Sequence, residues 1–341
     1  MASLETLYYS ILYSKMSIDL PIDAVLRPNS WNDYVGQEKI KQNLQIIIEA
    51  AKKRAETCDH LLFYGQAGLG KTTLAYLTAK ELGCNLKVTS GPALEKMGDL
   101  AAILSNLEQN DVLFIDEVHR LNKTIEEVLY PAMESRKLHL VIGKGPGARS
   151  VALDLSPFTL IAATTKVHLL SGPLRSRFGA SFKLDFYEPT DIEAIVRRSA
   201  KILQMMLTSE AVTMLARAAR FTPRVANRLL KRVRDYAEVH NYSKVDAEVV
   251  KKTMELLEID DLGLEPADRR LLDVIIRKFN GGPVGINSLA AVLNDEAENI
   301  EEISEPYLMS LGFLLRTSSG RMVTPAAYQH LSLKPPQDSL V

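Results

Sequence analysis

Between residues 22 and 185, short apolar runs alternate with longer segments whose apolar positions recur at helical spacing. Runs of this length are typical of buried strands, and the intervening segments are typical of amphipathic helices. Strands that alternate with helices form parallel sheets covered by helices on both faces. This region therefore predicts one α/β domain over residues 22–185, with strands at Leu61–Tyr64, Val112–Ile115 and Phe158–Ala163.

The pattern changes in the next segment of the chain, where strand signals disappear as far as residue 258. Apolar residues here follow the i, i+3, i+4 spacing of one helix face. They include Ile192, Ile195 and Val196, and further on Val225, Leu229, Leu230 and Val233. The pattern predicts a small all-helical domain over residues 186–258.

Residues 259–334 combine helical segments with a predicted β-hairpin. Gly263 and Pro266 interrupt the chain near the start of this region. Three helical segments are followed by two short strands around a Ser-Ser-Gly turn: 271–279, 286–293, 300–311, and then 313–316 and 321–323. This order is typical of a winged-helix DNA-binding domain. Residues 1–21 and 335–341 are interpreted as an N-terminal extension and a C-terminal tail.

The composition is that of an ordinary globular protein, with 341 residues of which 46% are hydrophobic and 24% are charged. It excludes disordered, collagenous and disulfide-stapled chains. The two cysteines fit a reducing compartment, and neither they nor the six histidines show metal-ligand spacing. No apolar run approaches the roughly 20 residues that span a bilayer, so we expect a cytoplasmic protein without a membrane partner. Since the net charge is only −1, a nucleic acid would have to be held by a local basic patch.

A glycine-rich loop follows the first predicted strand. Residues 65–72 read Gly-Gln-Ala-Gly-Leu-Gly-Lys-Thr and match the phosphate-binding pattern G-x-x-x-x-G-K-[ST]. Backbone N–H groups of such a loop face one centre, and the helix that begins near Lys71 adds the positive end of its dipole. Lys71 is expected to reach the β- and γ-phosphates, Thr72 to hold Mg²⁺ and Thr73 to contact the α-phosphate. The predicted nucleotide contacts are Gly68, Leu69, Gly70, Lys71, Thr72 and Thr73.

Two acidic residues follow the second predicted strand. Asp116 and Glu117 come directly after Val112–Ile115, at the edge of the sheet where open α/β folds bind their ligands. Asp116 can hold Mg²⁺, and Glu117 can orient or deprotonate an attacking water. Thr165, after the third strand, lies at the same edge and can hydrogen-bond the γ-phosphate or the water. The pattern predicts nucleotide hydrolysis and not binding alone.

Two arginines stand at positions that favour a role beyond solvation. Arg177 lies just past the third strand, from where its guanidinium can enter a neighbouring subunit and stabilise charge on the γ-phosphoryl group. Arg224 follows Thr222 and Pro223, which open a helix and hold the arginine near its N-terminus. From there Arg224 can report bound nucleotide to the helical domain.

Short motifs are distributed over most of the chain. They are Leu26-Arg27-Pro28, 35–38 (Val-Gly-Gln-Glu), 65–73, 116–120 (Asp-Glu-Val-His-Arg), 128–134, 163–165 (Ala-Thr-Thr), 222–228, 281–285 (Gly-Gly-Pro-Val-Gly) and 305–308 (Glu-Pro-Tyr-Leu). In this order they resemble the RuvB family, bacterial AAA+ motors that drive branch migration of Holliday junctions. The resemblance extends from Leu26 to Leu331.

The resemblance implies a homohexameric, ring-forming ATPase that uses ATP and Mg²⁺. Its implied action is translocation of duplex DNA during homologous recombination and DNA repair. The implied roles are Walker A for Lys71 and Thr72, Walker B for Asp116 and Glu117, sensor 1 for Thr165, sensor 2 for Arg224 and arginine finger for Arg177.

The resemblance also implies contacts that the residue pattern alone does not suggest. Leu26, Arg27 and Tyr187 would line the nucleotide pocket, and the segment Glu134, Ser135 and Arg136 of one subunit would lie near the adjoining one. Residues 142–150 are similar to the hairpin that docks on a RuvA-type partner, and a RuvC-type resolvase is a further implied partner. Arg316 and Arg321 are similar to wing arginines that touch DNA phosphates, which positions a duplex without reading its sequence.

Four positions depart from the family pattern. Phe221 stands where a glycine usually precedes Thr-Pro-Arg, Lys166 replaces an arginine, and Ser319 and Ala297 replace basic residues of the wing region. Residues 259–341 contain seven basic and twelve acidic residues, a poor balance for holding phosphates. We therefore expect DNA affinity to be weaker, or to depend more on the loading partner, than is usual in the family.

Two other functions would use the same nucleotide residues. A clamp-loader-like or protein-remodelling AAA+ switch would bind protein and not DNA with its C-terminal domain. A nucleotide-binding scaffold would not turn over, although Glu117 and Arg177 argue against it.

Overall fold

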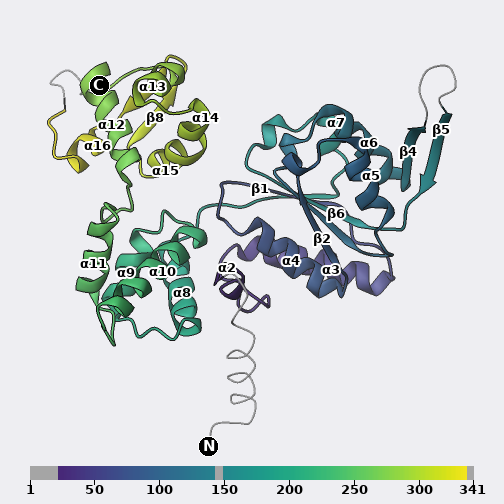
Figure 1. Cartoon of the computed structure of the whole chain (residues 1–341), viewed down its shortest axis with the longest axis horizontal. Helices are drawn as coiled ribbons and strands as arrows, with labels where there is room; N and C mark the ends of the chain where they lie inside the picture. Colours follow the sequence, from purple (N-terminus) through teal and green to yellow (C-terminus); the bar gives the residue numbers. More distant parts are fainter. Residues whose placement is uncertain (1–21, 143–148, 336–341) are drawn as a thin grey trace, which may run out of the picture. The chain divides into compact units, whose positions relative to one another are not determined.

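The structure is a computed structural model that describes residues 22–142 and 149–335. The chain divides into two compact units, one ending at Tyr187 and the other beginning at Glu188 (Figure 1). The predicted extension 1–21, the centre of the 142–150 hairpin and nearly all of the predicted tail lie outside the described residues. The predicted boundaries of three domains stay predictions. Within the described ranges, no helix is both long and apolar enough to cross a membrane.

The first unit is built around five parallel strands in the order β2-β3-β6-β1-β7. Their bounds are Leu86–Ser90 (β2), Val112–Asp116 (β3), Thr159–Thr164 (β6), Leu61–Tyr64 (β1) and Ala180–Lys183 (β7). The three central strands are buried apolar runs, and the sequence predicts them to within one residue. The edge strands β2 and β7 are partly exposed and mix polar with apolar residues. Because they contain no apolar run, the sequence pattern does not predict them.

Helices cover both faces of this sheet (Figure 1). One face carries α3 (Glu38–Arg54) and α4 (Lys71–Leu82), and the other carries α5 (Met97–Ser105), α6 (Lys123–Ser135) and α7 (Gly172–Arg175). The short segments of this unit are α2 (Ile22–Val25), η1 (Gly91–Ala93), η2 (Val118–Arg120) and η4 (Val167–Leu169). A separate antiparallel hairpin, β4 (Lys137–Ile142) with β5 (Arg149–Asp154), projects from the domain. The expected α/β P-loop architecture is confirmed.

The second unit begins with four packed helices and continues into a winged helix. The first four are α8 (Pro189–Ile202), α9 (Ser209–Arg217), α10 (Pro223–Val239) and α11 (Ala247–Leu256). The winged helix contains α12 (Pro266–Phe279), α13 (Ile286–Leu293), α14 (Ala297–Asn299), the π-helical turn η5 (Ile300–Ser304), α15 (Glu305–Ser310), β8 (Leu314–Thr317), β9 (Gly320–Val323) and α16 (Pro325–His330). The helical part and the winged helix are therefore both confirmed as folds.

One predicted helix differs from the structure. The pattern predicts a single helix over 300–311, whereas the chain forms a π-helical turn at Ile300–Ser304 before α15. Pro306 lacks the N–H group that a regular α-helix needs at this position. The break therefore follows from a proline that the apolar spacing does not register.

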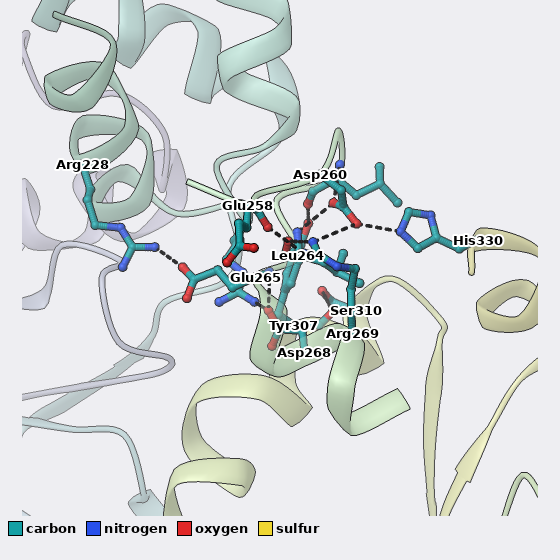
Figure 2. Close-up of polar contacts among 12 residues, drawn as sticks. Arg228, Glu258, Asp260, Leu264, Glu265, Asp268, Arg269, Tyr307, Ser310 and His330 are labelled. Carbon is teal, nitrogen blue, oxygen red and sulfur yellow. Dashed lines mark hydrogen bonds and ion pairs between the residues drawn. The ribbon is translucent and has the colours of Figure 1, made fainter. Parts of the chain in front are cut away.

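The winged helix is joined to the four-helix part by polar contacts (Figure 2). The guanidinium of Arg220 pairs with the buried carboxylate of Asp268, and Arg228 pairs with Glu265. Phe221 adopts φ 55°, a left-handed conformation that glycine adopts without strain, and its ring centroid lies 5.8 Å from that of Tyr307. The family's usual glycine would fit this backbone, and the phenylalanine adds an aromatic contact across the joint.

Candidate functional site

The loop from Gly65 to Gly70 connects β1 to α4 in a conformation that requires glycine. At Gly65, φ is 141° and an added Cβ would lie 2.4 Å from the carbonyl oxygen of Leu184. At Gly70, φ is 98° and an added Cβ would lie 2.9 Å from the hydroxyl of Tyr34. Because α4 begins at Lys71, the N–H groups of its first turn open onto this loop, as a phosphate site requires.

Lys71 donates hydrogen bonds to the main chain of its own loop. Its side chain is buried, and Nζ donates to the carbonyl oxygens of Gly65 at 2.7 Å and Gln66 at 2.8 Å. A phosphate group offers a lysine a charge-assisted hydrogen bond, which is stronger than one to a neutral carbonyl. The ammonium is therefore already positioned where a bound phosphate can attract it. Thr72 and Thr73 follow in the first turn of α4 and are half-buried.

Two tyrosines support the loop from behind. The hydroxyl of Tyr187 donates to the carbonyl oxygen of Leu69 at 3.1 Å and lies 3.0 Å from the hydroxyl of Tyr34. Burial raises the pKa of Tyr34 well above its usual value, so its hydroxyl stays protonated. Tyr187 is predicted from the family resemblance, whereas Tyr34 is not. The available signal for Tyr34 is its place directly before the 35–38 motif.

The predicted pocket residues near the start of the chain differ in exposure. Leu26 is buried, while Arg27 is exposed. The amide of Gln37 donates to the carbonyl oxygen of Asp185 at 2.7 Å, which ties the 35–38 motif to the segment before Tyr187. The motif therefore positions backbone beside the loop, and a nucleotide contact by Leu26 or Arg27 stays a prediction.

The two acidic residues lie at the carboxyl end of β3. Asp116 is its last residue, and Glu117 follows with φ 50°, in the left-handed region. The Thr165 hydroxyl lies 3.4 Å from Oε2 of Glu117, so the structure brings these two predicted residues together. His119 Nδ1 also lies 3.4 Å from this oxygen and 2.8 Å from the Thr164 hydroxyl. His119 is part of the 116–120 motif, but its contact with Glu117 is not predicted from the sequence.

The carboxylates at the end of β3 suit a Mg²⁺ ion that is bound together with a nucleotide. Within residues 22–142 and 149–335, no group of three or more metal-ligating side chains forms a cage. Mg²⁺ usually binds through one or two protein ligands together with phosphate oxygens and water. Oδ1 of Asp116 accepts a hydrogen bond from the Glu117 N–H at 3.0 Å, and no donor among the described residues occupies its Oδ2. One carboxylate oxygen therefore remains for an ion.

Arg177 is folded against its own domain. Its guanidinium lies 4.4 Å from the ring centroid of Tyr130, and Nη2 lies 3.0 Å from Oε1 of Glu134. Nη1 donates to the carbonyl oxygen of Pro173 at 2.6 Å. Of the segment implied to lie near an adjoining subunit, the structure brings Glu134 to Arg177, while Ser135 and Arg136 are exposed beside it.

Arg224 belongs to the second unit. It lies in the first turn of α10, where Thr222 caps the helix by accepting a hydrogen bond from the Val225 N–H at 3.4 Å. The predicted helix start is thus confirmed, and Arg224 is exposed. Its role as a nucleotide sensor stays a prediction.

The two predicted DNA contacts differ in burial. Arg316 on β8 is exposed, with its guanidinium 3.4 Å from Oε1 of Glu301. Arg321 on β9 is buried, and donates to Glu305 and Glu301, each at 2.6 Å. Arg321 can reach a phosphate only if both ion pairs break. Of these two arginines, Arg316 is the one that presents its charge to solvent, and the DNA contact of each stays a prediction.

Two C-terminal motifs have structural explanations in these contacts. Residues 281–285 run beside β9, where Val284 bridges Arg321 and an added Cβ on Gly282 would lie 2.3 Å from the Arg321 carbonyl oxygen. In the 305–308 motif, Glu305 pairs with Arg321, and the Tyr307 hydroxyl donates to the carbonyl oxygen of Leu262. Both motifs therefore make contacts inside the winged helix.

The hairpin expected to dock on a RuvA-type partner is described only at its base. Ile142 pairs with Arg149 at the last described step of the β4–β5 ladder, and Arg149 is exposed. Residues 143–148 lie outside the described residues.

Three family models match consecutive parts of the chain. They are the Holliday junction DNA helicase RuvB P-loop domain over residues 26–184, the RuvB AAA lid domain over 187–260 and the RuvB C-terminal winged helix domain over 261–332. Together they span both compact units.

Solved structures of a bacterial relative agree with these matches. The Thermotoga maritima RuvB Holliday junction branch migration motor is 49% identical, with a TM-score of 0.85 over 92% of this chain and 100% of that one. A lysine-to-arginine mutant of that protein is 48% identical, with a TM-score of 0.85 over 91% and 99% of the two chains. An arginine-to-alanine mutant is also 48% identical, with a TM-score of 0.84 over the same shares. Given these matches and the phosphate loop, acidic edge and winged helix described above, the chain belongs to the RuvB family of AAA+ ATPases, the Holliday junction branch migration motors.

Proposed function

We propose that this chain hydrolyses Mg²⁺-bound ATP at sites shared between neighbouring copies in a hexameric ring, and uses the energy to move duplex DNA at Holliday junctions. The observation that carries the proposal is the arrangement around the loop. The buried Lys71 donates to the Gly65 carbonyl of the phosphate loop, and the Glu117 carboxylate accepts from the Thr165 hydroxyl. Family membership favours this function over a clamp-loader-like switch, because the match includes the RuvB winged helix.

Within one copy, the phosphate loop binds and orients ATP. Loop N–H groups and Lys71 contact the phosphates, while the supporting tyrosines hold the Leu69 carbonyl. Thr72 and Asp116 would hold Mg²⁺, which neutralises charge on the β- and γ-phosphates when bound. Glu117 orients the attacking water, and Thr165 holds the Glu117 carboxylate or contacts the γ-phosphate.

The second half of each site comes from the neighbouring copy. Arg177 enters as an arginine finger and stabilises the charge that develops during phosphoryl transfer, an effect worth about 10³-fold or more in rate. Glu134, Ser135 and Arg136 lie beside it along the same edge and contact the same nucleotide. Arg224, on the first turn of α10, senses the nucleotide of its own copy.

The DNA contact of the winged helix is weak in this chain. Arg316 offers an exposed cation to a phosphate, while Arg321 is paired internally. The region around them is acidic overall, which opposes the binding of DNA. Productive engagement therefore relies on a RuvA-type partner that docks on residues 142–150 and holds the junction. A RuvC-type resolvase acts on the same assembly.

The proposal is tested by measuring ATPase rate and strand separation on a four-way DNA junction, with and without a RuvA-type protein. We expect the ATPase rate to rise with duplex or junction DNA, and branch migration to need both ATP and the partner. A rate that DNA and partner both leave unchanged would contradict the proposal. Salt-sensitive DNA binding that Arg316→Ala weakens would exclude the protein-remodelling alternative.

A further inference from the structure

The side chain of Arg177 is held from three directions by its own chain. The ring of Tyr130 lies under the guanidinium at 4.4 Å, Glu134 lies at its edge, and the Pro173 carbonyl accepts from Nη1. The side chain still keeps 19% of its surface exposed. The arginine is thus restrained without being enclosed.

Tyr130 is itself fixed to the segment that carries the arginine. Its hydroxyl lies 3.1 Å from a carboxylate oxygen of Glu126 on the same helix and 3.0 Å from the hydroxyl of Ser171. Ser171 caps α7 by accepting from the Leu174 N–H at 3.2 Å, and Arg177 follows directly after α7. Ser171 therefore caps the start of α7 and also contacts the hydroxyl that positions the Tyr130 ring.

A second arginine–tyrosine pair shows what a purely structural contact looks like in this chain. Arg220 lies 4.8 Å from the ring centroid of Tyr307, but it is only 8% exposed and pairs with the buried carboxylate of Asp268. That arrangement neutralises and encloses the charge. At Arg177 the carboxylate partner, Glu134, has a 58% exposed side chain, and an exposed ion pair is weak.

We propose that Tyr130 is a positioning residue for Arg177, holding the guanidinium on its ring in the geometry in which it meets the nucleotide of a neighbouring copy. This inference rests on the proposed shared site. A free arginine side chain populates many rotamers, and restraining it in advance reduces the entropy lost when the γ-phosphoryl group is engaged. An aromatic face attracts the cation without cancelling its charge, so the full charge remains for the transition state.

The test compares Tyr130→Leu and Tyr130→Phe, each alone and mixed with Lys71→Ala chains. A cation–π contact is worth about 0.5–2 kcal/mol, so Y130L should lower kcat by about tenfold. The KM for ATP should stay unchanged, because the residue acts on a neighbour's transition state. Y130F keeps the ring and should stay within about threefold of wild type. Mixing Y130L with K71A should restore turnover at Y130L sites, because K71A chains supply an intact Tyr130–Arg177 pair.

Controls separate this inference from the proposed shared site. Arg177→Ala is measured in the same way, with ring assembly of each mixture checked by sedimentation. If K71A chains in assembled rings fail to restore R177A, the shared site itself is wrong. If K71A restores R177A but Y130L has wild-type kcat, or its lost activity is not restored, the positioning role is overturned. Should Y130L unfold, Tyr130→Met keeps a similar volume without the aromatic face and takes its place.

Discussion

Lys71 and Arg321 are both buried cations with equal exposure, at 6%, but their surroundings differ. Lys71 donates hydrogen bonds to two main-chain carbonyls of its own loop, whereas Arg321 donates to two carboxylates. A phosphate can compete with a carbonyl for a cation, but it has to displace a carboxylate that is already charged. Burial alone therefore does not distinguish a ligand-binding cation from a structural one, and the groups that a phosphate would have to displace also matter.

The same contrast separates the two wing arginines. Arg316 and Arg321 both contact Glu301, yet only Arg321 also reaches the buried Glu305. The wing thus pairs one arginine in its interior and leaves the other exposed to solvent. Substitutions on each side of this comparison have different expected effects.

The largest expected effect is that of Lys71→Ala. It should reduce ATPase activity by about 10³-fold or more, because it removes the cation that contacts the β- and γ-phosphates. The thermal midpoint of unfolding should fall less than in Arg321→Leu, since Lys71 donates to carbonyls of its own loop, whereas loss of Arg321 leaves the buried Glu305 without its partner. Nucleotide titration, steady-state ATPase and a melting curve on the same sample check this. A large loss of stability would place Lys71 with Arg321 as a structural cation.

Glu117→Gln should lower kcat by about 10²-fold while ATP still binds. The amide keeps the shape of the side chain near Thr165 but cannot orient water as a carboxylate does. Single-turnover hydrolysis and ATP affinity distinguish the two steps. Loss of ATP binding with unchanged single-turnover chemistry would contradict the assigned role.

Arg321→Leu should destabilise the winged helix by about 3–5 kcal/mol, because it leaves the buried Glu305 without its partner. The double variant Arg321→Leu with Glu305→Leu should recover most of that loss, since no uncompensated charge remains. Urea unfolding of the single and double variants measures both values. A single variant as stable as wild type would show that Arg321 is not structural.

Arg316→Ala is the matched control and should change stability by less than about 1 kcal/mol, because its pair with Glu301 is exposed. It should weaken duplex binding and reduce the slope of log affinity against log salt by about one. Fluorescence anisotropy at several salt concentrations measures the slope. An unchanged slope would remove Arg316 from the DNA interface.

The smallest effect concerns a buried group that carries no charge. Nδ1 of His60 accepts from the Leu160 N–H at 2.8 Å, Nε2 lies 3.2 Å from the Met133 carbonyl oxygen, and burial lowers the pKa of the ring. The histidine therefore binds a proton less readily in the folded state than in the unfolded state, where its pKa is about 6.5. Stability from this group is complete above that pH and is lost as the pH falls below it. Wild type should lose more unfolding free energy than His60→Gln between about pH 7 and pH 5.5, and equal losses would contradict this.

Much of the nucleotide site is local in the sequence and is therefore predictable from it. The loop, the helix at Lys71 and the acids after β3 are each contiguous motifs whose spacing follows from strand and helix geometry. The fold class follows in the same way from apolar periodicity. The edge strands are not predicted because their residues lack an apolar pattern, and the π-helical turn is not predicted because apolar spacing does not register Pro306.

What the sequence could not predict depends on partners that are distant along the chain. Tyr34 reaches Tyr187 across 153 positions, and Tyr130 reaches Ser171 across 41. From the sequence alone, Arg321 is predicted to be an exposed cation of the wing, because arginine and glutamate usually lie at the surface. The fold places Glu305 beside it and buries the pair. Only packing decides which charge is neutralised internally.

The most direct test of the shared site is the ATPase rate per chain, measured over a wide range of protein concentrations with and without four-way junction DNA. If Arg177 of one copy completes the site of another, the rate per chain rises with concentration as copies assemble, and junction DNA with a RuvA-type partner shifts the rise to lower concentration. A well-folded protein whose rate per chain is constant across the range, and unchanged by DNA and partner, would contradict the account.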